Sequence, residues 1–449
     1  MSVRSRLLCA GLALLFSLAT RQFATASAEL DRRLDELAIE GHFAGAVVIR
    51  RDDRVVYQRG LGLADPVTGR LFSPNTVVET GSVTKPVTAA AVLTLAADGR
   101  LNLDEAVRAS LPEYPHPGTT VGQLLMHAGA LPDYSAFEPE LTSGRVIRAT
   151  DLLAMIGARS PQSDSPAGRR FSYCNICFDT LALLVERKTG QSFEAFVRGR
   201  FLEPAGATGV FVRPARLKDW RGERSAGYRR TPAGVEPNDV FDNEGFYGGG
   251  NLYFSAADLA AWMAAWANGH AALRPIRGPA TQLVAFSDGR SGLTLGSWYC
   301  APGRARCYYP GHHQGFHAFG YWDSRRRLAI ALVSNGTLSP RLQVEIPRLL
   351  IAAAEGRTLP ARSGAAGGAA QGVQPGVYLV QGVGTVTISA KDGRLGVIAP
   401  GFTRYPLFPA GDGWLYAPGL DLYLTPGSRR GEILWWSVFH QSVGRQAED

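Results

Sequence analysis

Apolar runs bounded by turn residues predict strands near both ends of residues 29–356. Residues 45–51 and 54–58 are rich in Val, Ile and Tyr and are separated by Asp52-Asp53, a pattern that predicts a β-hairpin. Residues 327–334 form an apolar run typical of a buried strand, and residues 340–354 have the spacing of a packing helix. With strands at both ends and helical patterns between them, we expect an α+β fold in which an antiparallel sheet joins the two ends and is covered by helices.

One helix is apolar on nearly every face. It is predicted to begin at Ser82 and to run to Gly99, and its residues 89–95 are almost all Ala, Val or Leu. Pro86 has no N–H to donate and is best accommodated in a first turn, which fixes the start of the helix near Ser82. A helix without a polar face should be buried at the centre of the domain.

The pattern changes near residue 357. Residues 356–372 are rich in Gly and Ala and are predicted to be a linker. After them come short alternating runs at residues 384–389, 395–398, 413–416 and 432–436, separated by Gly, Pro and Asp turns. We therefore expect three parts after the N-terminal segment: residues 29–355, the linker 356–372, and a small antiparallel β-barrel at residues 373–449.

The first 28 residues resemble a secretory signal peptide. Arg4 and Arg6 precede an apolar run over residues 7–19, and Ala26-Ser27-Ala28 forms a small-residue cleavage site. The run is too short to span a bilayer, so we expect no transmembrane segment after cleavage and a periplasmic or secreted protein. Removing Arg4, Arg6 and Arg21 from the formal charge of +8 leaves +8 − 3 = +5, and the positive residues are scattered, which argues against a nucleic-acid partner.

Four cysteines follow the signal segment. Cys300 and Cys307 flank six residues between two aromatic segments, which predicts a hairpin with a crosslink near its turn. Cys174 and Cys177 fit either buried thiols or a local disulfide. Two further ligands with similar spacing would be needed for a metal site, and the sequence offers none, so we expect no metal and no cofactor.

The chemistry begins with Ser82 and Lys85. Residues three apart lie on one face of a helix, so the hydroxyl and the amine can come within hydrogen-bond reach, as an activated nucleophile requires. The chain holds only four lysines among 47 Lys and Arg residues, and this position keeps the cation that can act as a base. A Ser-x-x-Lys pair alone is weak, because it arises by chance in about one such chain in four.

Two further segments carry candidate groups. Tyr173 and Asn175 are expected to project from a loop before an apolar helix at residues 178–188; Tyr173 could take the Ser82 proton, and Asn175 could hold a substrate carbonyl. Alone, Tyr-x-Asn is more often structural. The third segment, residues 311–317, holds three histidines but no acid or Cys, and neighbours on an extended chain point to opposite faces, which argues against a metal site.

Ser-x-x-Lys, Tyr-x-Asn and His-x-Gly in this order resemble the penicillin-recognising serine hydrolases, which comprise class C β-lactamases, D,D-peptidases, D-aminopeptidases and esterases. The resemblance covers most of residues 30–355, including Gly60 to Asp65, Val121 to Pro132 and Gly248 to Leu259. It implies a β-lactamase-like sheet with an all-helical subdomain, and it assigns Ser82 as the nucleophile, Lys85 as its activating partner and Tyr173 as the general base. Asn175 and His313 would bind substrate beside Gly315, the N–H groups of Ser82 and Phe316 would form the oxyanion hole, and Gln123 matches a substrate-contacting Gln of class C β-lactamases.

The departures from the family pattern suggest a subclass. His313-Gln314-Gly315 replaces the Lys-Thr-Gly of class C β-lactamases, as in the D,D-peptidases and D-aminopeptidases of the group. The β tail resembles the lipocalin-like C-terminal domain of some members. We therefore expect an exported serine hydrolase that acts through an acyl-enzyme on small-molecule or peptide substrates, including cell-wall peptides: a D-residue-specific peptidase or amidase, or a small-ester esterase. The alternatives are a class C-like β-lactamase and a non-catalytic module that binds cell-wall peptides. The sequence leaves the oligomeric state open.

Overall fold

The computed structural model describes residues 26–159, 167–231, 234–239, 244–286, 289–360, 372–391, 393–402, 404–411, 413–418 and 420–447. The predicted signal peptide therefore lies almost wholly outside the described residues, as does most of the predicted linker. Residues 26–39 are helical. No helix among the described residues is long and apolar enough to cross a membrane.

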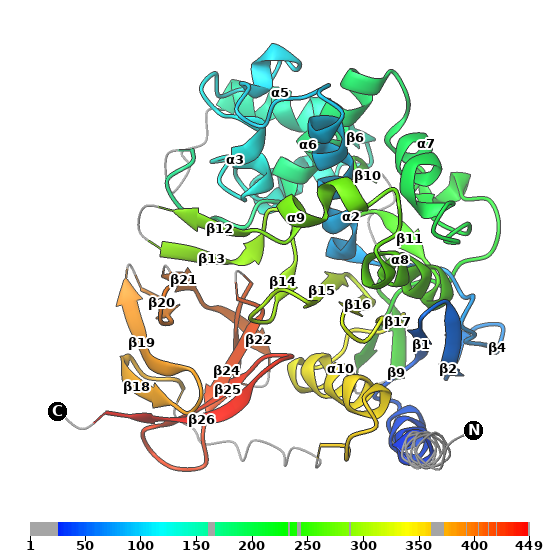
Figure 1. Ribbon diagram of the computed structural model, residues 1–449, viewed down its shortest axis with the longest axis vertical. Helices are drawn as coiled ribbons and strands as arrows, with labels where there is room; N and C mark the ends of the chain where they lie inside the picture. The colour runs from blue at the N-terminus through cyan, green and yellow to red at the C-terminus, as the bar shows by residue number, and fades with distance from the viewer. Residues whose placement is uncertain are drawn as a thin grey trace, which may run out of the picture.

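The central feature is an eight-stranded sheet whose hydrogen-bonded order places the strands nearest the two ends of residues 29–355 side by side (Figure 1). Its strands, in spatial order, are β12 (Leu283–Phe286), β13 (Gly289–Thr294), β14 (Tyr299–Cys300), β15 (Arg306–His313), β16 (Phe316–Asp323), β17 (Leu328–Ser334), β1 (Gly45–Arg51) and β2 (Arg54–Leu61). The β1 strand pairs antiparallel with β17, from Gly45 opposite Ser334 to Arg51 opposite Leu328. The predicted hairpin and the antiparallel sheet that joins the ends are both confirmed.

Helices cover both faces of this sheet. Helix α8 (Ala256–Asn268) packs on β1, β16 and β17 and buries Trp262 and Trp266, while α10 (Pro340–Ala354) packs on β17. Burying one such aromatic side chain contributes about 1.5–3 kcal/mol. Arg33, in the helix at residues 26–39, forms a buried ion pair with Glu345 of α10, with 2.8 Å between Nη2 and Oε1.

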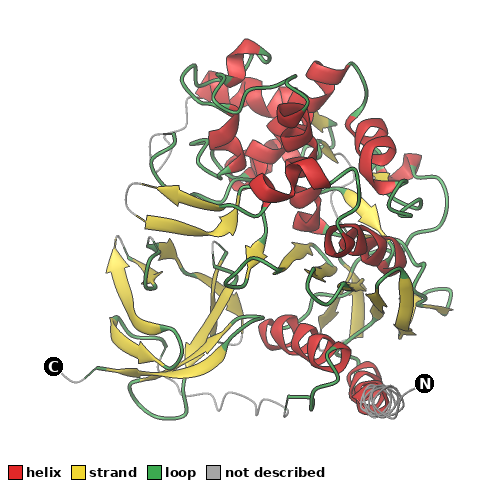
Figure 2. Cartoon of the chain, viewed as in Figure 1, coloured by secondary structure: helices red, strands yellow, loops and turns green. Residues whose placement is uncertain are grey.

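The remaining helices gather at one end of the molecule, away from the C-terminal sheet (Figure 2). They comprise α2 (Thr84–Ala97), α3 (Val121–Leu125), α4 (Glu138–Leu141), α5 (Ala149–Arg159), α6 (Asn175–Thr189), α7 (Phe193–Val197) and α9 (Arg277–Ala280). Every residue of α2 from Thr84 to Leu95 is buried, as the sequence predicts for a helix without a polar face.

Two boundaries differ from the sequence prediction. The α-helix begins at Thr84, and Ser82 instead lies in a 3-10 turn, η1 (Gly81–Val83), which follows the short strand β5 (Val78–Glu79). Asn175 lies in no loop but is the first residue of α6, because the sulfur of Cys174 accepts the N–H of Cys177 and caps the helix one turn earlier than expected. Strand β5 pairs with β11 (Leu252–Phe254), which also pairs with β7 (Phe211–Val212).

The chain ends in a nine-stranded, nearly closed antiparallel sheet, which confirms the predicted β-barrel and with it the α+β class. Its strands, in spatial order, are β21 (Tyr405–Pro406), β20 (Arg394–Ile398), β19 (Gly384–Lys391), β18 (Gly376–Val380), β26 (Gln441–Gln446), β25 (Glu432–Trp436), β24 (Leu422–Pro426), β23 (Trp414–Ala417) and β22 (Phe408–Gly411). This sheet packs closely on the rest of the chain: Tyr405 contacts Phe171, with ring centroids 5.3 Å apart, and Phe439 contacts Tyr308 at 4.9 Å. The domain boundaries at residues 356 and 372 remain a prediction.

Both cysteine pairs are disulfides. Cys300 and Cys307 lie directly opposite each other on β14 and β15, as predicted for a crosslinked hairpin. Cys174 and Cys177 are also bonded, which decides between the two alternatives that the sequence left open.

Candidate active site

The strand-to-helix turn at Gly81 presents Ser82 to two polar side chains. The Nζ atom of Lys85 lies 2.9 Å from Ser82 Oγ, and the hydroxyl of Tyr173 also lies 2.9 Å from it. Lys85 is fully buried, and its ammonium donates further to Asn175 Oδ1 at 2.8 Å and to the Gly249 carbonyl at 2.6 Å. Three acceptors for three N–H donors fix Lys85 in one position beside the hydroxyl.

The ring of Tyr173 packs against two neighbours. Lys85 Nζ lies 4.9 Å from the ring centroid, and the buried imidazole of His127 stacks on the ring at 4.7 Å. His127 Nδ1 accepts the N–H of Cys174, so the imidazole that stacks on Tyr173 is anchored to the backbone of the next residue. Burial, and then the charge of Lys85, hold the pKa of His127 well below its ordinary value, so its ring stays neutral. The Cys174–Cys177 disulfide does not displace Tyr173 from Ser82.

A buried carboxylate organises the far side of Lys85. Asp179 accepts the hydroxyl of Tyr134 at 2.6 Å and the N–H of Gly249 at 2.9 Å, and the carbonyl of the same Gly249 accepts Lys85. Burial raises the pKa of Asp179 to about 6, against the lowering effect of these two hydrogen bonds. Asp179 thus orients the backbone group that positions the lysine.

The third motif, His313-Gln314-Gly315, lies at the turn between β15 and β16. This turn packs against η1, the turn that carries Ser82. A Cβ atom on Gly81, whose φ is +53°, would lie 2.7 Å from the His312 carbonyl oxygen, so only glycine allows this close approach. Gly315, with φ +68°, has equally little room, because a Cβ there would lie 2.2 Å from the Asn238 carbonyl oxygen. Phe316 is buried at the start of β16, which packs on η1.

His313 forms a pair with a carboxylate that the sequence did not single out. Its Nδ1 lies 3.3 Å from Oε2 of Glu79, which is fully buried, whereas the His313 side chain is 28% exposed. The same Glu79 accepts the N–H of Gly81 at 2.7 Å and that of Asn251 at 2.8 Å. Burial lowers the pKa of His313, but the Glu79 carboxylate outweighs it and the pKa lies above its ordinary value.

The other two histidines of this segment form a separate pair. Nδ1 of His312 and Nδ1 of His317 lie 2.9 Å apart. Burial lowers the pKa of His312 to about 4 and also lowers that of His317. Within the described ranges, no three His, Cys, Asp or Glu side chains are arranged to hold a metal ion.

Of two residues predicted to bind substrate, Asn175 contacts Lys85, whereas Gln123 caps a helix. Asn175 is bound to Lys85 through Oδ1, and its Nδ2 lies 3.5 Å from Asp133 Oδ1. Gln123 instead closes a capping box at the start of α3, where its side chain accepts the N–H of Thr120. None of the hydrogen bonds among described residues links Gln123 to Ser82, Lys85 or Tyr173. Its role in binding substrate remains a prediction.

Aromatic side chains connect Tyr173 to the C-terminal sheet. The hydroxyls of Tyr173 and Tyr309 lie 3.3 Å apart, and Tyr309 stacks on Tyr299 with ring centroids 5.5 Å apart. Tyr299 donates to the Pro418 carbonyl in the connection between β23 and β24. One side of the site is therefore walled by the C-terminal sheet.

Sequence reasoning missed Glu79, His127 and Asp179. His127 had a visible signal, since it is the one ionisable residue in the apolar stretch Leu124 to Ala128. Glu79 lies three residues before Ser82, but its partners Asn251 and His313 are remote in the sequence. Asp179 occupies a helical position that reads as an ordinary polar residue.

Comparisons with known proteins identify the family of this chain. A family model described as Beta-lactamase matches residues 30–355. Penicillin-binding protein 4* of Bacillus subtilis is 27% identical over 201 residues, 44% of this chain and 45% of that protein, and Esterase EstB of Burkholderia gladioli is 34% identical over 201 residues, 41% and 50%. The chain thus spans about half the length of these relatives.

Solved structures show the same fold. An octameric penicillin-binding protein homologue from Pyrococcus abyssi superposes with a TM-score of 0.65 at 18% identity, over 93% of this chain and 100% of that one. The D-amino acid amidase of Ochrobactrum anthropi gives a TM-score of 0.56 at 18% identity, over 69% and 91%. Together with the family match, which covers well over half of its length, these findings place the chain in the beta-lactamase family, whose members include penicillin-binding proteins, esterases and amidases.

Proposed function

We propose that this chain is an exported serine hydrolase that forms an acyl-enzyme at Ser82, and that it cleaves amide bonds of D-residue compounds or small esters. The observation that carries the proposal is the pair of contacts at Ser82 Oγ, 2.9 Å from Lys85 Nζ and 2.9 Å from the Tyr173 hydroxyl. A serine hydroxyl is a weak nucleophile unless an adjacent group can take its proton. Both neighbours sit within the distance that such a transfer requires.

The residues suggest a complete reaction. In its phenolate form, Tyr173 takes the Ser82 proton as Oγ attacks the substrate carbonyl, and the positive charge of the buried Lys85 stabilises the phenolate and the attacking oxygen. The N–H groups of Ser82 and Phe316 would stabilise the oxyanion. The leaving amine or alcohol then receives the proton, an ester to Ser82 remains, and a water activated by the same groups hydrolyses it to release the acid.

His313 and Glu79 favour a substrate with a carboxylate. Glu79 engages Nδ1 of His313, which leaves Nε2 of the partly exposed ring to meet a ligand. Because the Glu79 charge raises the pKa of His313 above its ordinary value, His313 is protonated more readily than a free imidazole and can present a cation to a substrate carboxylate. This supports peptides with a free C-terminal carboxylate over amino acid amides and neutral esters, which carry none.

A second candidate, hydrolysis of small esters, is favoured by the 34% identity with Esterase EstB. The two candidates differ in how binding responds to pH. For a carboxylate substrate, KM should rise as pH increases through the raised pKa of His313, whereas KM for a neutral ester should stay flat.

The test is a panel of nitrocefin, short-chain p-nitrophenyl esters and D-Ala-terminated peptides, with Ser82→Ala as the control. We expect turnover of a D-peptide or an ester that Ser82→Ala abolishes, and slow turnover of nitrocefin. Fast nitrocefin hydrolysis would instead support a class C-like β-lactamase. If no compound were turned over and no adduct formed while the protein bound cell-wall peptides, the enzyme proposal would be wrong and the binding-module alternative would stand.

A further inference from the structure

A hollow lined by arginines lies at the opposite end of the β15–β16 hairpin from the candidate active site. It encloses about 250 Å³ and is lined by Pro302, Ala305, Arg306, Arg325 and Arg326. Arg306 begins β15 and faces Asp323 at the end of β16, whereas His313 and Phe316 close the other end of the same hairpin. Seven residues at roughly 3.4 Å each separate Arg306 from His313, or about 24 Å. The hollow is a separate site.

The lining holds three guanidinium groups and no carboxylate. Arg326 is balanced by buried acids, since its Nη1 lies 3.1 Å from Asp323 Oδ2 and 3.7 Å from Glu355 Oε1. Within the described part of the chain, Arg306 and Arg325 form no ion pair. Two positive charges therefore remain uncompensated at the hollow.

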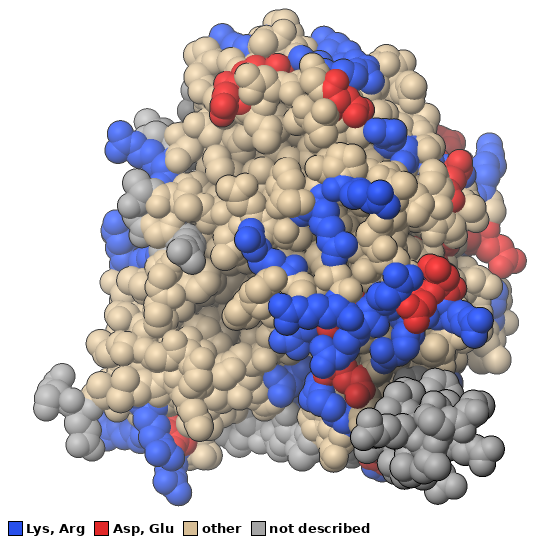
Figure 3. Space-filling view, in the orientation of Figure 1, with Lys and Arg blue, Asp and Glu red and all other residues tan. Residues whose placement is uncertain are grey.

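The positive charge extends beyond the hollow. Figure 3 shows Lys and Arg side chains gathered on the face where β16, β17 and α10 lie, with only a few acidic side chains among them. Such a surface attracts anions from solution before any specific contact forms.

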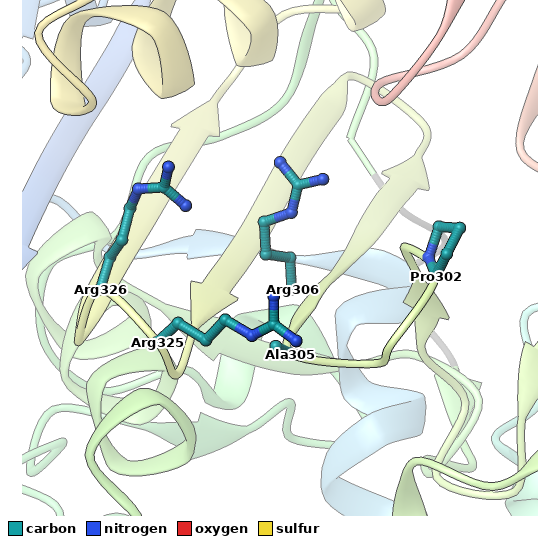
Figure 4. Close-up of a pocket in the computed structure, with 5 residues that line it drawn as sticks. All are labelled: Pro302, Ala305, Arg306, Arg325 and Arg326. Atoms are coloured by element: carbon teal, nitrogen blue, oxygen red, sulfur yellow. The ribbon is translucent and has the colours of Figure 1, made fainter.

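The two free guanidinium groups are oriented by their surroundings. Arg306 lies over the ring of Phe439, with its Cζ 5.5 Å from the centroid, which leaves the N–H edge of the fork unoccupied. Arg325 reaches from the β16–β17 turn toward Ala305, and a Cβ on Gly303 would lie 3.5 Å from its Nη2 (Figure 4). Arg306 and Arg326 extend to the same side of the hairpin (Figure 4).

The loop that carries these groups is held rigid. The Cys300–Cys307 disulfide closes it, and within it Ala301 N–H donates to the Arg306 carbonyl at 2.9 Å. The neighbouring turn is joined to it by the N–H of Ser324, which donates to the Ala305 carbonyl at 2.8 Å. A preorganised site loses less entropy when it binds a ligand.

We propose that this hollow binds a phosphate group, as inorganic phosphate, a soluble phosphate ester or the headgroup of a phosphomonoester lipid. A phosphate monoester carries a charge of about −1.5 to −2 near neutral pH and offers three acceptor oxygens, which matches two uncompensated guanidinium forks. A single carboxylate would balance only one of them.

The test measures binding of inorganic phosphate at low salt by titration calorimetry. The variant Arg306→Gln/Arg325→Gln removes both free forks, and Arg394→Gln/Arg429→Gln removes two exposed arginines of the C-terminal sheet as a charge-matched control. We expect the first variant to lose at least about tenfold in affinity and the control to bind like the wild type. Ester hydrolysis should be unchanged in both variants, since the hollow lies far from Ser82, which also reports that they fold.

A second arm identifies the source of the phosphate. Wild-type protein is sedimented with phosphatidylcholine vesicles with and without phosphatidic acid. Binding that requires phosphatidic acid, is competed by inorganic phosphate and is lost in Arg306→Gln/Arg325→Gln would assign a lipid headgroup; phosphate binding without vesicle binding would assign a soluble ligand. Absence of phosphate binding by the wild type, or equal binding by the two double variants, would overturn the proposal.

Discussion

Replacing Glu79 by glutamine should disturb the nucleophile turn and the third motif together. Glu79 is fully buried and accepts two backbone N–H groups, from Gly81 at 2.7 Å and from Asn251 at 2.8 Å. A glutamine side chain has one acceptor oxygen and one NH₂ group, so one of these N–H groups would face a donor. The substitution keeps the size of the side chain and removes its charge.

The cost can be bounded from these contacts. A hydrogen bond to a charged group contributes about 1.5–3 kcal/mol, and a buried donor left without a partner costs about 1–3 kcal/mol. We therefore expect Glu79→Gln to lower the free energy of unfolding by roughly 2–4 kcal/mol. This range assumes that one of the two N–H hydrogen bonds is lost and that the surrounding backbone relaxes in part. Because Glu79 holds the N–H of Gly81, the residue directly before Ser82, kcat/KM should also fall by at least about tenfold.

Part of the cost should depend on pH through His313. The pKa of His313 is raised in the folded protein, so its pair with Glu79 contributes stability that is complete below the unfolded pKa and is lost as pH rises through the folded pKa. Glu79→Gln removes this contribution. The substitution should therefore be more destabilising at about pH 5.5 than at about pH 9.

The assay is thermal unfolding of four proteins, the wild type, Glu79→Gln, His313→Gln and the double variant, at both pH values. In the His313→Gln background, the effect of Glu79→Gln should become independent of pH, because the titrating partner is gone. An equal Tm loss at both pH values in the wild-type background would refute the Glu79–His313 pair. Wild-type stability in Glu79→Gln would refute the role of Glu79 in holding the turn.

Two further predictions concern Lys85 and the wall of the site. Lys85→Arg should lower the rate of Ser82 acylation nearly as much as Lys85→Ala, because the guanidinium fork keeps the charge but is too large for the three acceptors that hold Nζ. Stopped-flow acylation measures this rate, and a largely active Arg variant would show that a positive charge alone is sufficient at this position. Asp421 is buried, burial raises its pKa to about 6, and the Tyr416 hydroxyl donates to it. The folded protein keeps the proton of the Asp421 carboxyl to higher pH than the unfolded chain does, so the stability that this group contributes is complete at low pH and is lost as pH rises through about 6. The Tm of Asp421→Asn relative to that of the wild type should therefore increase between about pH 4 and pH 7. A constant Tm difference over this range would contradict the prediction.

The elements that follow from local pattern were predictable from the sequence. The β1–β2 hairpin, the buried α2, the helix α10 and the crosslink between Cys300 and Cys307 each depend on residues close together in the chain. The three motifs also marked Ser82, Lys85, Tyr173 and His313 in advance. The structure brings these four together around one turn.

What the sequence did not reveal depends on contacts between distant residues. Glu79 acts through Asn251, which is 172 positions away, and no periodicity links the two. The wall formed by the C-terminal sheet rests on single contacts such as Tyr405 with Phe171, which arise only because this sheet packs on the loop before α6. The start of α6 at Asn175 depends on a cysteine sulfur in place of the usual capping oxygen.

The most direct test of the central claim is acylation of Ser82. The folded protein is incubated with a fluorescent penicillin, the intact mass is measured, and the adduct is mapped by peptide mass spectrometry, with Ser82→Ala as the control. The contacts of Ser82 with Lys85 and Tyr173 predict a single adduct on Ser82 that is absent from the control. An adduct on another residue, or labelling that persists in Ser82→Ala, would contradict the assignment of Ser82 as the nucleophile.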